Sequence, residues 1–105
     1  MRTVTKLCFW VMAVAMIFST WSFADDGADV FKSKCAVCHG ADGKGATAMG
    51  KSLKLRDLSS ADVQQQSDAD LANIITNGKD KMPKYGGKLT KDQINSVVKF
   101  IRTLK

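Results

Sequence analysis

Several residue types that build metal and catalytic sites are scarce in this chain. Its 105 residues include one histidine, one proline and three cysteines, and all ten of its acidic residues are aspartate. A structural zinc site needs about four Cys or His ligands, which so few residues supply poorly. No stretch alternates apolar and polar residues as a strand would, and no segment repeats. These absences argue against a zinc site, a site with two histidine ligands and a β-rich fold.

Two of the cysteines and the single histidine lie in one motif. Cys35 and Cys38 are three positions apart, and His39 follows directly, which is the attachment signature of c-type haem. In such a site each thiol adds across a haem vinyl group to form a thioether, and the histidine binds the iron from the proximal side. We therefore predict that Cys35 and Cys38 hold one haem c covalently, with His39 as the proximal iron ligand.

Three other interpretations of the cysteine pair were weighed. A thioredoxin-like redox pair is expected where a strand meets a helix, and no strand pattern lies upstream. Zinc would require more ligands than Cys35, Cys38 and His39, because Cys8 lies in the apolar leader. A structural disulfide remains open, although a gap of two residues is unusual for one.

Residues 1–24 have the three-part order of a secretory signal. A positively charged start is followed by an uncharged stretch at 7–18, and Ser22 and Ala24 place small residues at a cleavage site. We predict a signal peptide that is cleaved after Ala24 and directs export to the bacterial periplasm, where c-type haem is attached. Retention as a membrane anchor is the alternative, since an apolar stretch of about 18 residues can just span a bilayer.

Residues 25–105 then form one small domain. A chain of this size buries a limited share of its surface and normally needs a further stabilising element, such as a disulfide or a bound metal. A covalently held haem would provide one. The domain is mildly basic, which favours acidic protein partners, and it contains no nucleic-acid-binding motif. We predict a monomer with no membrane span after cleavage.

The residue spacing of this domain predicts an all-α fold. A first helix is expected from Asp25 into the haem motif, and the glycine-rich segment 40–45 is expected to form a loop around the haem edge. The pattern at 50–66 fits either a loop or a short helix.

Two later helices have clear starting signals. Ser67 caps a helix in which Leu71 and Ile75 share a face. Thr90 and Gln93 have the form of a capping box, and apolar residues follow at helical spacing at Ile94, Val97, Val98, Ile101 and Leu104.

The chain resembles the bacterial class I c-type cytochromes, which are small monohaem electron carriers. The resemblance rests on three blocks: Cys-Ala-Val-Cys-His-Gly within 27–45, Ile-Ile-Thr-Asn-Gly and Met-Pro-Lys-Tyr-Gly within 71–89, and the terminal run that ends in Phe-Ile-Arg-Thr-Leu. It implies the cytochrome c fold, with three to four helices and loops wrapped around one haem.

The resemblance also implies particular contacts. Gly27, Phe31 and Phe100 match the positions where the terminal helices of the family cross. In many members a proline carbonyl after the haem motif accepts the N–H of the proximal histidine. The only proline here is Pro83, so this chain departs from that pattern at His39.

A second axial ligand must come from a residue type other than histidine. Outside the leader the thioether candidates are Met49 and Met82. Met82 precedes Pro83, which favours an extended backbone, and it matches the axial methionine of the family. We predict Met82 as the distal iron ligand, with Met49 or an open or lysine-bound site as alternatives.

A haem iron with both axial positions filled has no site for substrate. We therefore predict an electron carrier and not an enzyme, which shuttles single electrons between reductase and oxidase or dehydrogenase partners. The lysines near Met82 would form the docking edge: Lys79, Lys81, Lys84 and Lys88. The alternatives are an electron-entry subunit anchored in a membrane complex, and a haem enzyme or gas sensor with an open distal site.

Overall fold

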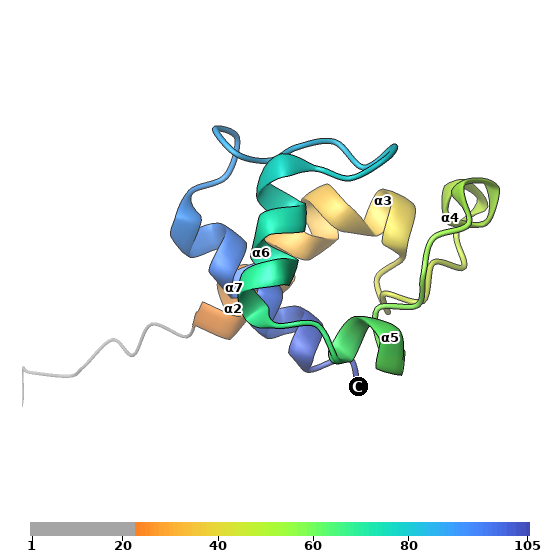
Figure 1. The fold of residues 1–105 in the computed structure, drawn as a ribbon, viewed down its shortest axis with the longest axis horizontal. Coiled ribbons are helices and arrows are strands. Elements are labelled where there is room, and N and C mark those ends of the chain that lie inside the picture. The colour runs from red at the N-terminus through yellow and green to blue at the C-terminus, as the bar shows by residue number, and fades with distance from the viewer. Residues whose placement is uncertain (1–22) are drawn as a thin grey trace, which may run out of the picture.

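The computed structural model describes residues 23–105, and this part of the chain is helical (Figure 1). Its elements are α2 (Phe23–Val30), η1 (Phe31–Cys35), α3 (Ala36–His39), α4 (Ala48–Leu53), α5 (Ala61–Gln64), α6 (Asp68–Asn77) and α7 (Lys91–Arg102). Within residues 23–105 the only β pairing is two isolated bridges, Lys79 with Met82 and Gly86 with Leu89. The prediction of an all-α fold is confirmed. Almost all of the predicted signal peptide lies outside the described residues, and its cleavage stays a prediction.

The first three elements form one helical run that leads into the haem motif. The run widens to a π-helix in η1, where the Ala36 N–H donates to the Phe31 carbonyl, five residues back. It ends after His39 at Gly40, whose φ of 82° lies in the region that favours glycine. The predicted helix is therefore confirmed. The π-helical turn within it was not predicted, because the sequence carries no signal for it.

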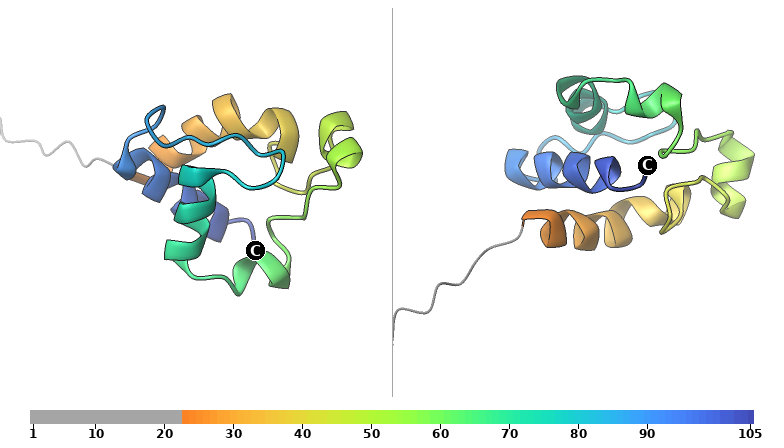
Figure 2. Two further views of the ribbon diagram at one scale, coloured as in Figure 1. Left: turned by 45° about the horizontal axis from the view of Figure 1, so that its top comes forward. Right: turned by 90° about the horizontal axis from the view of Figure 1, so that it is seen from below.

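Helix α7 packs against this run, as the right-hand view of Figure 2 shows. The capping box is present, because the Thr90 side chain accepts from the Gln93 N–H and the Gln93 side chain accepts from the Thr90 N–H. Gly27 permits the close approach, since a Cβ there would lie 2.6 Å from the Ser96 carbonyl carbon. The rings of Phe31 and Phe100 have centroids 4.9 Å apart. The helix contact implied by the resemblance is confirmed.

Helix α6 begins where the sequence predicts. The Ser67 hydroxyl accepts from the Asp70 N–H at 3.0 Å. Leu71 and Ile75 are buried in the core with Phe31 and the apolar face of α7. The helix ends before Gly78, with a φ of 76°.

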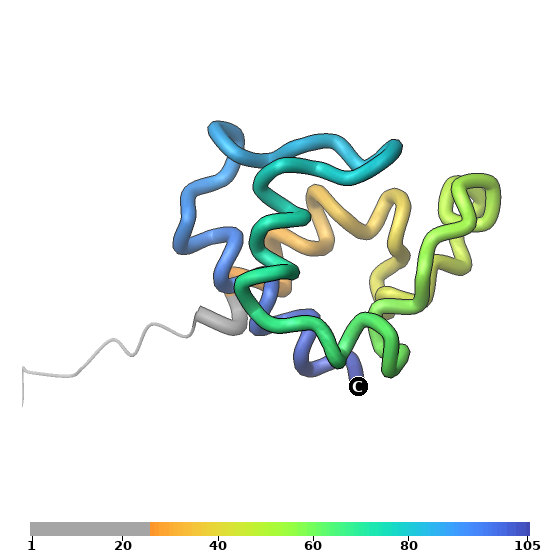
Figure 3. The backbone as a smooth tube through the Cα atoms, in the orientation of Figure 1, coloured from red at the N-terminus to blue at the C-terminus, as the bar shows by residue number. Residues whose placement is uncertain are grey.

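The segment between the haem motif and α6, which the pattern left undecided, contains the short helices α4 and α5 and extended connections. Figure 3 shows the backbone passing from α3 through these helices and back to α6. Arg102 of α7 holds the link between α5 and α6, donating to the carbonyls of Gln64 and Gln66 and to the Asp68 carboxylate. These bonds join parts of the chain more than 30 residues apart.

Candidate functional site

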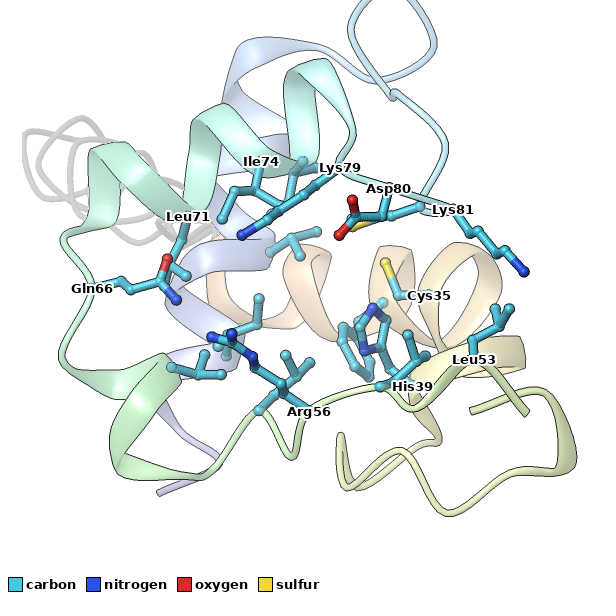
Figure 4. A pocket seen from close by; sticks show the side chains of 18 of the residues that line it. Cys35, His39, Leu53, Arg56, Gln66, Leu71, Ile74, Lys79, Asp80 and Lys81 are labelled. Carbon is cyan, nitrogen blue, oxygen red and sulfur yellow. The ribbon is translucent and has the colours of Figure 1, made fainter. Parts of the chain in front are cut away.

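A cavity of about 410 Å³ lies between the haem motif, the connection after α4, α6, the loop after α6, and α7. Figure 4 shows side chains from these segments pointing into it. The apolar part of its wall includes Phe31, Leu55, Leu58, Val63, Leu71, Ile75, Val97 and Ile101. A concave site with a largely apolar wall and a few polar side chains fits a flat, mostly apolar ligand.

The haem motif supplies one wall of this cavity. Cys35 is buried and His39 is half-buried, and both line the cavity. The Phe31 ring packs near the imidazole, with centroids 6.4 Å apart. Cys38 is half-buried but is not among the lining residues. The structure thus brings two of the three predicted motif residues to the cavity wall.

A second contact fixes the backbone of the motif from outside the cavity. The Thr47 hydroxyl donates to the Cys38 carbonyl at 2.6 Å and accepts from the Gly50 N–H at 2.9 Å. A Cβ on Gly50 would lie 2.7 Å from the Cys38 carbonyl oxygen. Helix α4 therefore rests directly on the end of the motif.

His39 has the character of a neutral metal ligand. Burial lowers the pKa of its imidazole, which keeps a nitrogen lone pair available for a metal. Its Nδ1 is buried with no hydrogen-bond partner among residues 23–105. This orphaned atom fits the departure noted in the sequence, because the family's usual proline acceptor is absent from the loop after His39.

The Cys35 thiol is unlike that of a redox-active cysteine. Cys35 and Cys38 are both free in this structure, so the disulfide alternative is not formed. Burial, and to a smaller extent the charge of Cys38, raises the pKa of the Cys35 thiol to about 11, whereas reactive redox cysteines have a lowered pKa. Residues 23–105 also contain no group of three or more His, Cys, Asp or Glu side chains that could hold a metal ion.

The loop after α6 brings Met82 to the cavity wall. A tight turn forms it: the Met82 N–H donates to the Lys79 carbonyl at 2.9 Å, and Asp80 adopts a φ of 52°. Gly78 lies against this turn, and a Cβ there would meet the Met82 carbonyl oxygen at 2.7 Å. Met49, the other candidate, is 49% exposed and does not line the cavity.

Three polar lining residues were not predicted from the sequence: Lys54, Arg56 and Gln66. Arg56 and Gln66 both reach into the cavity in Figure 4, across from the side chains of Lys79, Asp80 and Lys81. A signal for Arg56 existed, since it lies between the apolar residues Leu55 and Leu58. A cation there could meet the carboxylates of a haem. The cavity supplies the groups that a haem requires. Its walls are largely apolar, an imidazole and a thiol lie on one side, and a thioether lies on another.

Comparisons with known proteins agree with this chemistry. The sequence model of the family described as "Cytochrome C oxidase, cbb3-type, subunit III" matches residues 22–101. Cytochrome c6 of Picosynechococcus sp. is 33% identical over an alignment of 109 residues, which covers 96% of this chain and 92% of that protein. Cytochrome c6 of Porphyra purpurea is 32% identical over 105 residues, with 96% and 93% covered. Among solved structures, the c-type cytochrome KustC0563 has a TM-score of 0.71 at 30% identity and covers 76% of this chain and 98% of its own.

The chain belongs to the class I c-type cytochromes. The cytochrome therefore carries a covalently bound haem c, and it is an electron carrier and not an enzyme. Within residues 23–105 it has no helix with both the length and the apolar character needed to cross a membrane.

Proposed function

We propose that this cytochrome is a periplasmic one-electron carrier in which Cys35 and Cys38 hold the haem and His39 and Met82 bind its iron. The observation that carries the proposal is the composition of the cavity wall. Cys35 and His39 lie on the side formed by the haem motif, and Met82 lies on the loop after α6. Met49 is outside the cavity, which supports Met82 as the thioether ligand.

The bound haem supplies the one-electron couple, and the residues of the chain control it. His39 and Met82 would fill both axial positions, so no substrate could reach the iron. A methionine ligand favours Fe(II) and raises the reduction potential. Phe31 beside His39 belongs to the hydrophobic core, and Met82 on the loop after α6 packs against the same core, so electron transfer would need little rearrangement.

The surface beside Met82 is suited to acidic partners. Four exposed lysines lie in this segment, with Asp80 as the one acid among them: Lys79, Lys81, Lys84 and Lys88. Complementary charge speeds encounter with a partner more than it raises affinity. We propose that these lysines form the docking edge for donor and acceptor proteins, and that the carrier is monomeric.

Ligation is tested by comparing two methionine variants. Methionine bound to ferric haem gives a weak far-red charge-transfer band, and we expect Met82→Ala to lose this band and bind added imidazole. Met49→Ala is the matched control and should keep the band. Loss of the band in Met49→Ala, with retention in Met82→Ala, would reverse the assignment.

Export and attachment are tested by intact mass. Cleavage after Ala24 and thioether formation predict a chain that lacks residues 1–24 and retains one haem after extraction with acid acetone. A product that keeps the leader would support the membrane-anchored alternative. Haem in the extract would exclude the thioethers.

A further inference from the structure

The loop that carries Met82 is joined directly to the helical run before the haem motif. The Tyr85 hydroxyl donates a hydrogen bond of 3.1 Å to the carbonyl of Lys34, a residue 51 positions earlier in the chain. Lys34 immediately precedes Cys35. Tyr85 is the only tyrosine of the chain, so no other phenol can replace it.

The remaining hydrogen bonds of this loop are local or lead to α6. The Tyr85 N–H donates to the Ile75 carbonyl at 3.0 Å, and the Gly86 N–H donates to the Thr76 carbonyl at 2.9 Å. Lys79 and Met82 bond to each other across the turn. In the part of the chain that the structure describes, the Tyr85 hydroxyl makes the only hydrogen bond between the loop and the run that contains Cys35 and His39.

The Lys34 carbonyl, which accepts this hydrogen bond, lies in the π-helical turn. Lys34 belongs to η1, where the helix widens just before Cys35. Wide turns of this type often occur at functional sites, because they redirect backbone and side chains within a helix. A bond to this turn therefore links the loop to the backbone that positions the first haem thiol.

Packing of the Tyr85 ring restricts where its hydroxyl can lie. The ring is half-buried and, like Met82, packs against the hydrophobic core. The Lys88 ammonium lies over the ring, 5.9 Å from its centroid. A ring held in this way loses little additional freedom when its hydroxyl bonds to Lys34.

We propose that Tyr85 is a positioning residue whose hydroxyl clasps the Met82 loop to the haem-attachment helix and so keeps Met82 on the iron. Tyr85 does not bind the iron, and it acts by opposing the outward movement of the loop. The inference rests on the ligation proposed above. A neutral hydrogen bond of this kind should change the equilibrium between closed and open loop by roughly five-fold, since water can reach an opened Lys34 carbonyl.

The test is an imidazole titration of the ferric holoprotein. Added imidazole binds only after Met82 leaves, so Tyr85→Phe, which removes one oxygen, should raise the apparent imidazole affinity roughly five-fold. Amide exchange should also quicken at Lys79 and Met82 while staying unchanged in α7. Thr103→Val is the control, because it removes a hydroxyl that bonds the Phe100 carbonyl in the last turn of the chain, and it should leave imidazole affinity unchanged.

The outcomes separate this inference from the ligation on which it rests. If Met82→Ala loses the far-red band and Tyr85→Phe binds imidazole with unchanged or weaker affinity, the clasp is wrong and the ligation stands. If Met82→Ala keeps the band, both fail. Equal gains in imidazole affinity in Tyr85→Phe and Thr103→Val would reflect a general loss of stability and would also overturn the clasp.

Discussion

Substitution of Gly50 by alanine tests how tightly α4 is fitted to the haem motif. Two effects oppose each other. Alanine is favoured over glycine inside a helix by about 1 kcal/mol. The added Cβ, however, would lie 2.7 Å from the Cys38 carbonyl oxygen and closer still to that of Gly45.

The steric crowding of the added Cβ should outweigh the gain in helix propensity. Ordinary contacts of a Cβ begin near 3.4 Å, so α4 must move away from Cys38 by about 0.7 Å or more. Both obstacles are backbone atoms and cannot rotate aside. Overpacking of this kind costs about 1–3 kcal/mol, and the movement also strains the Thr47 bonds to Cys38 and Gly50. With about 3 kcal/mol lost and about 1 kcal/mol gained, we expect Gly50→Ala to destabilise the holoprotein by about 2 kcal/mol.

The assay is unfolding in guanidinium chloride, followed by haem absorbance and helical signal. Gly50→Ala should lower the midpoint with an unchanged slope, since the slope follows the surface exposed on unfolding. Ser52→Ala, at an exposed position of the same helix, is the control and should stay within about 0.5 kcal/mol of the parent protein. A Gly50→Ala protein as stable as the parent would refute the close approach of α4 to the motif.

Two further predictions concern charge. Changing both Lys81 and Lys84 to Glu should slow electron transfer to an acidic partner at low salt and have little effect at high salt, because surface charges act within about 10 Å at 0.1 M salt. The same change at Lys91, the first residue of α7, and at Lys105, three residues beyond its end, is the control. Equal slowing by both pairs would mean that net charge acts without a docking face. Arg56→Leu should lower the reduction potential, because losing a positive charge from the cavity wall favours Fe(III). One unit charge acting over about 10 Å in a water-like dielectric would shift the potential by about 20 mV. An unchanged or higher potential would place Arg56 away from the haem.

Local sequence signals predicted the helices that frame the site. The caps at Ser67 and Thr90 and the apolar spacing after them depend on residues within one or two turns. The haem motif is equally local, since Cys35, Cys38 and His39 act as neighbours on one short helical segment. Such signals require no knowledge of the rest of the fold.

What the sequence did not predict depends on contacts between distant segments. The close fit of Gly50 on Cys38, the reach of Arg56 into the cavity and the bond from Tyr85 to Lys34 each join separate parts of the chain. Their local patterns fit several arrangements, and only tertiary packing selects one. The preference for Met82 over Met49 came from Pro83 and from the family resemblance, and the cavity adds independent support because Met82 lines it and Met49 does not.

Addition of carbon monoxide to the reduced parent protein tests the central claim most directly. If His39 and Met82 fill both axial positions of a covalently bound haem, the iron has no free site, and the visible spectrum should not change at neutral pH. A full and rapid shift to a carbonyl spectrum would contradict the claim. It would show an open distal position, as in a haem enzyme or gas sensor.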